Sequence, residues 1–278
     1  MSAEDLHSEC LKPWLKTAFT GRCCLYAPLF PSTNAELKDR AGSLPEGTLC
    51  FCDAQSAGRG RSNHLWHSPC GVNLYFSVLL CPPAADGRRL PQLAMLAALA
   101  LHRTLRSLLP ATEVSLKWPN DLWIGCRKIS GILCEVAGRR PDGTIPVVVG
   151  VGLNVNSAAA DFPPELRESA GSLAICTGGT RFNRAEILAH FLNRLEEIYL
   201  QWRSSDDFSP FIAEWQRHDL LNGRTIAVEH PAGMIRGTVC GLSAGGSLLL
   251  RREGQGENMP PEEILAGDIH ILRESIVP

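Results

Sequence analysis

Residues 90–109 limit the possible fold most, because apolar side chains recur nearly all the way round the helix that this segment predicts. A helix that is apolar on every side must be largely buried. Its most apolar part, residues 93–101, ends at His102-Arg103, well short of the ~20 residues that span a bilayer. The 278 residues suit one large domain, or a large domain followed by a small one. We therefore expect a soluble protein with no membrane partner.

Short strands lie on both sides of this helix in the sequence, and three further helices are expected. Thr33, followed three residues later by Glu36, has the pattern of a capping box, so the first helix should begin there. The predicted strands are residues 22–27, 48–53, 73–80, 114–117, 122–124, 129–136 and 147–154, and the other helices are residues 184–202 and 207–218.

The chain changes character after residue 221. Residues 224–229, 234–242, 247–250 and 268–272 predict short strands separated by glycine-rich turns. This pattern is typical of a small β-barrel or sandwich, about the size of an SH3-like module. We place the boundary near Asp219, which divides the chain into residues 1–218 and residues 219–278.

Charge and cysteine content narrow the function classes. The net charge of -2 gives no basic excess, so neither nucleic acid nor an anionic membrane is expected as a partner. Acidic residues occupy the start of the chain, where a signal peptide needs a basic segment. The 11 cysteines lack the paired spacing of a structural zinc site, and most lie among apolar neighbours. We expect small buried thiols in a reduced, cytoplasmic protein.

The loop that joins two of the predicted strands contains Gln55-Ser56-Ala57-Gly58-Arg59-Gly60-Arg61. Glycine lets backbone N–H groups approach an anion closely, and arginine adds planar donors that match phosphate or carboxylate. The spacing is neither that of a Walker A loop nor that of a dinucleotide fingerprint. Taken alone, anion binding and an ordinary soluble loop are about equally well supported.

The segment Lys117-Trp118-Pro119-Asn120-Asp121 collects a cation, an amide and a carboxylate at one corner. Pro-Asn-Asp is good turn chemistry, so a plain hairpin is the simplest interpretation, but a turn alone does not require the preceding lysine and tryptophan. Lys128 begins the next apolar strand, where a lysine is usually a solvated edge charge.

Two glycines interrupt the buried strand at residues 147–154. Gly150 and Gly152 remove side chains from one face of this strand, and Asn154 follows them. Two interpretations are open at this point: close packing against another backbone, or a flat slot for a planar group such as a base.

Together, and in this order, these pieces resemble the catalytic domain of biotin protein ligases. The resemblance spans residues 22–156, and the tail from Leu221 is similar to the small C-terminal β-domain of that family. The matching pieces are Ser32-Thr33-Asn34, Gly58-Arg59-Gly60-Arg61 with Trp66 and Ser68-Pro69, Lys117-Trp118-Pro119-Asn120-Asp121, Arg127-Lys128 through Gly131-Ile132-Leu133, and Gly150-Val151-Gly152-Leu153-Asn154.

The resemblance implies an α+β fold, with a mixed β-sheet and flanking helices related to class II aminoacyl-tRNA synthetases, followed by an SH3-like β-barrel. It implies that ATP, with Mg²⁺, activates biotin as biotinyl-5′-AMP, and that biotin then passes to one lysine of a biotin carboxyl carrier protein. The implied catalytic residues are Lys128, Arg61, Lys117, Asn120 and Asp121. The implied residues for binding biotin and the adenylate are Ser32, Thr33, Asn34, Gln55, Gly58, Arg59, Gly60, Arg61, Trp66, Lys128, Gly131, Leu153 and Asn154. Metal ligands are not implied for any residue.

The chemistry agrees with these implied roles. Attack by a carboxylate on the α-phosphate brings negative groups together, so positive charge is needed where charge builds up. A loop that closes over the adenylate would exclude water from a readily hydrolysed mixed anhydride. The carrier lysine must be neutral to attack, and Asp121 is a candidate to accept its proton.

This sequence departs from the resemblance in two places. Ser62-Asn63-His64-Leu65 follows Arg61, where many relatives have a further glycine and basic residues. Only about 20 residues precede the first predicted strand, which leaves no room for the winged helix-turn-helix of some relatives, so no operator binding is expected. Residues 158–166 form a Pro- and Ala-rich insertion with no predicted role, and a homodimer is left open.

Three other functions match parts of this sequence pattern. A lipoate or octanoate ligase shares the fold and the carrier-lysine chemistry, but the residue 58–61 and 117–121 motifs favour biotin. A non-catalytic biotin-binding regulator is expected to lose Lys128 or Arg61, and both are present. A DNA-binding repressor needs a basic patch and a recognition helix, which the sequence does not predict.

Overall fold

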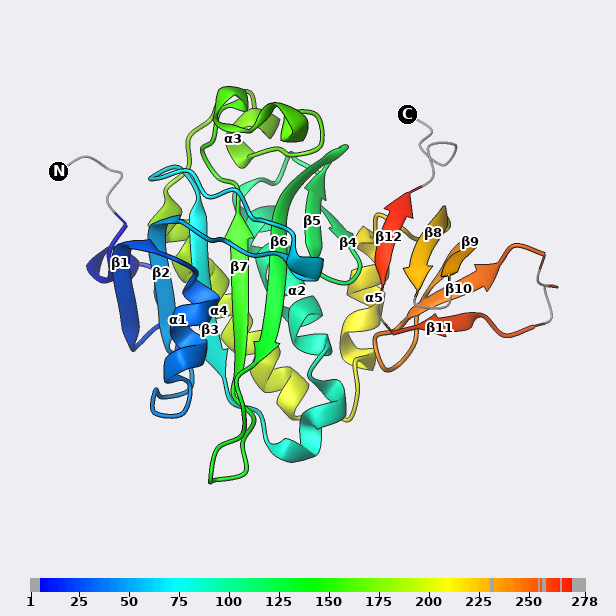
Figure 1. Cartoon of the computed structure of the whole chain (residues 1–278), viewed down its shortest axis with the longest axis horizontal. Helices are drawn as coiled ribbons and strands as arrows, with labels where there is room; N and C mark the ends of the chain where they lie inside the picture. Colours follow the sequence, from blue (N-terminus) through cyan, green and yellow to red (C-terminus); the bar gives the residue numbers. More distant parts are fainter. Residues whose placement is uncertain (1–5, 231–232, 255, 257–258, 266, 272–278) are drawn as a thin grey trace.

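The computed structural model describes residues 6–230, 233–254, 256, 259–265 and 267–271. Its larger part is built on a seven-stranded sheet, in the order β1-β2-β3-β7-β6-β5-β4 (Figure 1). The strands are β1 (Cys24–Phe30), β2 (Leu49–Gln55), β3 (Leu74–Leu80), β4 (Ser115–Lys117), β5 (Asp121–Ile124), β6 (Arg127–Val136) and β7 (Val147–Leu153). The sheet is mixed, because β1 and β2 pair in parallel while all other neighbouring strands of this sheet pair antiparallel.

Helices cover both faces of this sheet (Figure 1). They are α1 (Thr33–Arg40), α2 (Gln92–Leu108), α3 (Leu173–Cys176), α4 (Arg184–Arg203) and α5 (Ser209–His218), with short 3₁₀ turns η1 (Ser8–Leu11), η2 (Arg61–Asn63), η3 (Ala84–Arg89), η4 (Ala159–Asp161) and η5 (Pro164–Leu166). The apolar helix α2 is largely buried, as predicted, and packs beside α4 against one face. Helix α1 packs against β2, β3 and β7 on the other face.

Alternation along the strands separates the core from the other face. In β3, Leu74, Phe76 and Val78 belong to the core under α2 and α4, while Leu79 packs in a smaller cluster with residues of α1. In β7, Val149 and Leu153 likewise face the larger core. The intervening positions therefore face the side on which α1 lies.

The start of α1 corrects one prediction. The capping residue is Ser32, whose side chain accepts a hydrogen bond from the N–H of Ala35, and not Thr33. A cap needs extended backbone, which Ser32 has, while Thr33 is already in the helix. The Thr33 hydroxyl lies instead 2.7 Å from the hydroxyl of Ser77.

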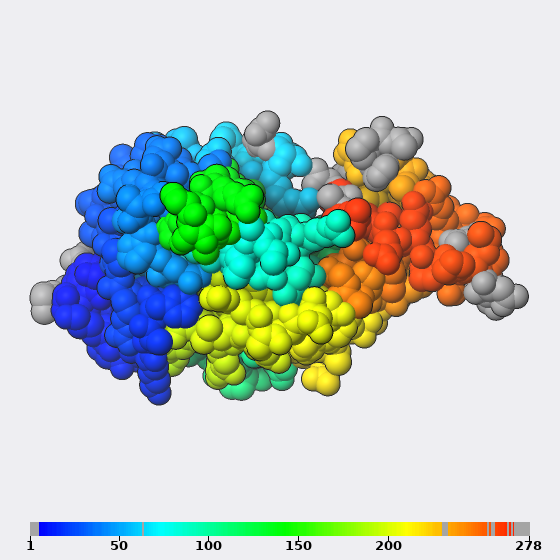
Figure 2. All heavy atoms as spheres, turned by 90° about the horizontal axis from the view of Figure 1, so that it is seen from below, coloured from blue at the N-terminus to red at the C-terminus, as the bar shows by residue number. Residues whose placement is uncertain are grey.

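A second sheet forms the C-terminal end of the molecule, coloured orange to red in Figures 1 and 2. Its strands are β8 (Thr225–His230), β9 (Gly233–Leu242), β10 (Leu248–Arg252), β11 (Glu262–Ile264) and β12 (Asp268–Ile271), in the antiparallel order β11-β10-β9-β8-β12. Strand β11 was not predicted. No pairing among the described residues joins β11 to β12, so this sheet is open where a closed barrel was expected.

The turn before β10 holds the second sheet against the first. The indole N–H of Trp118 donates to the carbonyl of Gly246 (2.9 Å), and the Gln92 amide donates to the carbonyl of Gly245 (3.0 Å). The N–H of Leu220 donates to the carbonyl of Leu116 in β4 (2.7 Å). The β4–β5 hairpin is thus bonded to the C-terminal part of the chain at Leu116 and Trp118.

The cysteine prediction holds only in part. All 11 thiols are free, but only Cys50, Cys52 and Cys81 are buried. Cys10, Cys24, Cys134 and Cys176 are partly buried against the core, whereas Cys70, Cys126 and Cys240 are exposed. None of the helices in the described part of the chain has the length and hydropathy that crossing a bilayer requires.

Candidate active site

A cavity of about 450 Å³ opens on the face of the larger sheet opposite to α2 and α4. Its floor contains Gly131, Gly150 and Gly152, which alternate along β6 and β7 with residues of the core. The residues predicted from the sequence that line this cavity are Ser32, Thr33, Asn34, Gln55, Arg59, Gly60, Arg61, Trp66, Lys117, Asn120, Asp121, Lys128, Gly131 and Asn154. Segments from five parts of the chain therefore meet in one place.

Strand register explains how they meet. Lys117 of β4 pairs with Asp121 of β5, Asp121 pairs with Gly131 of β6, and Gly131 pairs with Gly152 of β7. Cross-strand partners point to the same face of a sheet, so this row carries a cation, a carboxylate and two bare backbones side by side. The Pro-Asn-Asp turn closes the first hairpin with a hydrogen bond from the N–H of Asn120 to the carbonyl of Lys117 (3.2 Å).

Lys128 is an internal cation of the site and not a solvated edge charge. Its ammonium lies 2.7 Å from Oδ2 of Asp121, and its side chain is 34% exposed. The other carboxylate oxygen of Asp121 is buried and has no hydrogen-bond partner among the described residues. This oxygen can take a cation or a proton from a ligand.

Trp66 decides between the two interpretations for Gly152, whereas Gly150 faces Asn34. A Cβ atom on Gly152 would meet the indole ring of Trp66, 2.8 Å from Cζ2, and one on Gly131 would lie 3.1 Å from Cζ3. The two glycines therefore form a slot that a planar aromatic side chain of the protein occupies. The Trp66 indole N–H is buried and has no partner among the described residues, and the Lys128 ammonium lies 5.8 Å from the ring centre.

The Gly- and Arg-containing loop folds into a narrow hairpin over the cavity. Arg59 and Leu65 form an isolated antiparallel β-bridge, and the N–H of Gly60 donates to the carbonyl of His64 (2.7 Å). The turn η2 forms the tip of this hairpin. The guanidinium of Arg61 donates to Oδ1 of Asn120 (3.2 Å). The tip is thus bonded to the turn that follows β4.

One end of the cavity presents uncharged polar groups. The N–H of Thr33 donates to Oε1 of Gln55 (3.0 Å), and the Gln55 amide donates to the hydroxyl of Ser68 (3.2 Å). The Asn34 amide oxygen lies 2.6 Å from the Ser77 hydroxyl. Gly150 is required here, because a Cβ atom at this position would collide with the Asn34 side chain.

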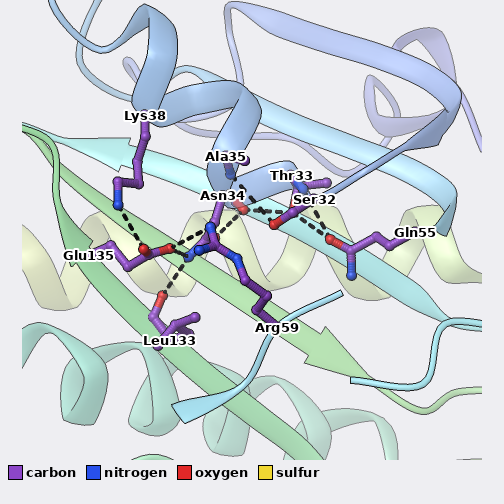
Figure 3. Close-up of polar contacts among 10 residues, drawn as sticks. Ser32, Thr33, Asn34, Ala35, Lys38, Gln55, Arg59, Leu133 and Glu135 are labelled. Carbon is purple, nitrogen blue, oxygen red and sulfur yellow. Dashed lines mark hydrogen bonds and ion pairs between the residues drawn. The ribbon is translucent and has the colours of Figure 1, made fainter. Parts of the chain in front are cut away.

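Beside this end lies an ionic cluster centred on Glu135 of β6 (Figure 3). Lys38 and Asn34 each donate to its carboxylate at 2.8 Å, and the guanidinium of Arg59 lies 3.5 Å away. Burial raises the pKa of Glu135, but the hydrogen bonds from Lys38 and Asn34 and the charge of Arg59 outweigh burial and hold it below its ordinary value. Glu135 is therefore a carboxylate that neutralises cations at this end.

The C-terminal sheet reaches the other end of the cavity. The ammonium of Lys117 donates to the carbonyl of Ile269 (3.2 Å), and the guanidinium of Arg61 lies 3.4 Å from the carbonyl of Gly267. Both carbonyls belong to the segment that leads into and forms β12. The described residues contain no group of three or more His, Cys, Asp or Glu side chains that could hold a metal ion.

Comparisons with known proteins agree with this geometry. The sequence pattern of the biotin/lipoate A/B protein ligase family matches residues 26–154. The biotin–[acetyl-CoA-carboxylase] ligase of Paracoccus denitrificans is 30% identical over 240 residues, covering 85% of this chain and 97% of the relative. The bifunctional ligase/repressor BirA of Bacillus subtilis is 33% identical, covering 85% of this chain and 71% of the relative.

A solved structure extends the likeness to the fold. The biotin protein ligase from Aquifex aeolicus, in complex with biotin and ATP, matches with a TM-score of 0.75 at 29% identity, covering 91% of this chain and 99% of that one. This chain belongs to the biotin protein ligase family. The mixed sheet with flanking helices is the fold of that family, as the resemblance implied.

Two residues predicted from the family motifs do not line the cavity. Leu153 is fully buried in the core, because alternation along β7 turns it to the face opposite Gly152. Gly58 lies under the hairpin, where a Cβ atom would be 2.6 Å from the carbonyl oxygen of Trp66. Both positions support the site from behind.

Other residues in and next to the cavity were missed. Ser77 and Glu135 do not line it, but both bond the lining residue Asn34. Ser77 and Glu135 lie on predicted strands at positions that alternate with core residues, so strand period could have indicated them. The insertion at residues 158–166, which the sequence left without a role, forms part of the rim through Phe162 and Leu166. The carbonyl of Asp161 bonds the His67 ring at 2.7 Å, which joins the insertion to the segment after Trp66.

Proposed function

We propose that this chain is an ATP-dependent biotin protein ligase that forms biotinyl-5′-AMP and transfers biotin to a lysine of a carrier protein. One observation carries the proposal. A single cavity has uncharged donors and acceptors at one end and the cations Lys117, Lys128 and Arg61 at the other. A substrate with a neutral polar head and a carboxylate that must meet a phosphate fits that division.

The uncharged end supports biotin over lipoate and octanoate. Biotin has a ureido group with N–H donors and a carbonyl acceptor, which Thr33, Asn34 and Gln55 can match. The dithiolane of lipoate and the alkyl chain of octanoate offer no such groups and would form no hydrogen bonds with these residues. A site built to hydrogen-bond its substrate rejects analogues that lack the bonding groups.

In the first half-reaction, an oxygen of the biotin carboxylate attacks the α-phosphorus of ATP, and the bond to pyrophosphate breaks. Negative charge gathers around the α-phosphate, so nearby fixed cations lower the barrier most. We assign Lys128 to the reacting carboxylate and phosphate, and Lys117, Asn120 and Asp121 to the organisation of that corner. The hairpin with Gly58, Gly60 and Arg61 would cover the adenylate and exclude water.

Trp66, Gly131 and Asn154 would lie along the nucleotide. The unpartnered indole N–H of Trp66 is available to an acceptor on the ligand, and the ring offers a face for the adenine. Mg²⁺ would enter with ATP and neutralise charge on the phosphates. The unpartnered oxygen of Asp121 fits it, since Mg²⁺ on nucleotides is commonly held by one or two carboxylates, phosphates and water.

In the second half-reaction, a neutral carrier lysine attacks the acyl carbon of the adenylate, an amide bond forms, and AMP leaves. The amine loses a proton in this step, and we keep the unpartnered oxygen of Asp121 as the candidate acceptor. The expected partner is a biotin carboxyl carrier protein or domain of a biotin-dependent carboxylase. That the protein has no nucleic-acid partner stays a prediction. Whether it forms a homodimer is left open.

We also propose that residues 1–218 form the catalytic domain and that residues 219–278 form an SH3-like domain. The five-stranded antiparallel order of β8 to β12 supports this division. The contacts of Gly267 and Ile269 with Arg61 and Lys117 support a role of this second domain in catalysis.

The test is biotin-dependent exchange of pyrophosphate into ATP in the presence of Mg²⁺, with lipoate and octanoate in parallel. Exchange with biotin alone supports the proposal, and transfer is then measured as biotin incorporated into a carrier domain. Exchange with lipoate or octanoate but not biotin would favour the lipoate ligase alternative. No exchange by a folded protein that still binds biotin would favour a non-catalytic regulator.

A further inference from the structure

Glu135 lies outside every motif of the resemblance, yet it joins two parts of the cavity. Its side chain is 18% exposed, and both carboxylate oxygens are used. Oε1 accepts from Lys38, while Oε2 accepts from the Asn34 amide and faces the guanidinium of Arg59 (Figure 3). One oxygen therefore serves a residue of α1 and a residue of the hairpin over the cavity.

The contact of Glu135 with Asn34 has a fixed geometry. The Asn34 amide also donates to the carbonyl of Leu133 (3.1 Å), its oxygen lies against Ser77, and the side chain fills the space above Gly150. A buried amide with every group bonded holds one orientation, because any rotation leaves a polar atom without a partner. Asn34 therefore keeps the carboxylate of Glu135 in place.

The contact of Glu135 with Arg59 is more exposed and has fewer supporting bonds. The Arg59 side chain is 43% exposed, and Glu135 is its ion-pair partner in the described structure. Arg59 belongs to the hairpin, which is held elsewhere by the bond from Arg61 to Asn120 and by Trp66 in its glycine slot. Loss of the Glu135 contact removes the connection nearest to the uncharged end.

We propose that Glu135 is a positioning residue that holds the hairpin closed through Arg59 and so slows the escape of the bound adenylate. This inference rests on the proposed function and concerns retention, not chemistry. Glu135 is not assigned to contact biotin or ATP. Its carboxylate fixes the guanidinium at a defined place above the uncharged end, where solvent would otherwise leave the arginine without a fixed position.

The experiment measures the release of a sulfamoyl analogue of biotinyl-adenylate from the full-length protein by stopped-flow tryptophan fluorescence. The analogue does not react, so catalysis is not needed. In Glu135→Gln the shape and the acceptor for Asn34 remain, but the charge opposite Arg59 and Lys38 is lost. We expect release to become roughly fivefold faster, which corresponds to about 1 kcal/mol. A half-exposed ion pair contributes little more than this to the stability of the closed hairpin. The Glu36→Gln variant is the matched control, because Glu36 pairs with Arg40 on the same helix, and its release rate should equal that of the natural protein.

A double mutant separates action through Arg59 from a general structural effect. Arg59→Met alone should accelerate release, and adding Glu135→Gln should then change the rate less than twofold. Glu135→Asp keeps the charge and should restore slow release in part. Thermal unfolding of each variant is followed in parallel, because a purely structural residue would lower the melting temperature and leave release unchanged.

The outcomes are distinct. Release from a folded Glu135→Gln protein at the natural rate overturns the inference, as does full multiplication of the two single effects in the double mutant. If Glu135→Gln does not fold, Glu135→Asp and the Arg59→Met background decide the question. A natural protein that neither binds the analogue nor exchanges pyrophosphate refutes the proposed function, and the inference with it.

Discussion

Replacement of Lys128 by methionine tests the cationic end most directly. Methionine keeps most of the length and apolar volume of the side chain but removes the ammonium that lies 2.7 Å from Asp121 and 5.8 Å from the centre of the Trp66 ring. The change therefore takes away one charge and leaves the walls of the cavity largely as they are.

The expected loss follows from what surrounds that charge. Removal of a single preorganised donor at the place where charge develops costs roughly 10²–10³-fold in rate. Here the variant also leaves the Asp121 carboxylate, one oxygen of which already has no partner, facing the incoming phosphate without its cation. Repulsion between Asp121 and the phosphate adds to the attraction that is lost with the ammonium. We therefore expect kcat/KM to fall near the upper end of that range, by roughly 10³-fold or about 4 kcal/mol.

Pyrophosphate exchange at saturating biotin gives the rate, and calorimetry gives the biotin dissociation constant. Because Thr33 and Gln55 lie at the uncharged end, biotin binding should weaken by roughly threefold or less. Lys12→Met is the matched control, since that lysine pairs with Glu9 on the surface, and the change should leave exchange unchanged. An exchange rate in Lys128→Met within tenfold of the natural rate would refute the role assigned to the lysine.

Three other perturbations have expected outcomes. Gly152→Ala should displace the Trp66 ring and raise the KM for ATP more than that for biotin; equal changes in the two KM values would contradict the nucleotide assignment. Arg61→Gly should open the hairpin tip and raise free biotinyl-adenylate, measured by trapping with excess amine; an unchanged level would count against a closing role. Burial raises the pKa of Asp219 to about 7 from an ordinary 3.8, so the folded state holds a proton that the unfolded state has lost. The stability that this proton provides is present below pH 4 and falls as the pH rises toward about 7, by roughly 2–4 kcal/mol in total; Asp219→Asn should flatten that fall in urea titrations at pH 5 and pH 8.

The fold was largely predictable because its elements differ clearly in hydrophobic period. The helix at residues 90–109 had to be buried, and α2 lies inside the core. Strand β11 was missed because Glu262–Ile264 is three residues long and two of them are glutamates, which gives no alternation to detect. The cap of α1 was misplaced by one residue because Ser32 and Thr33 are both good capping residues, and only the backbone conformation distinguishes them.

The site was predictable where side chains act and unpredictable where the backbone acts. Arginine and lysine in glycine-containing motifs indicated the cationic end. The carbonyls of Gly267 and Ile269 give no signal in the sequence, since every residue has one. Glu135 resembled any charged residue near the end of a strand until its position next to Asn34 and Arg59 was known.

The spacing of the motifs is a consequence of strand register. Gly131 and Gly152 are partners in neighbouring strands, and Asp121 is the partner of Gly131 on the other side. If β7 slipped by one residue, Val151 would lie under Trp66 and Gly152 would face the core, because side chains alternate with a period of two. The slot would be filled and a cavity would open among α2 and α4. A change that alters the length of the β6–β7 connection should therefore be tolerated, whereas an inserted residue within either strand should abolish both nucleotide binding and stable folding. The hydrophobic pattern of β7 thus fixes the position of the cavity floor as well as that of the core.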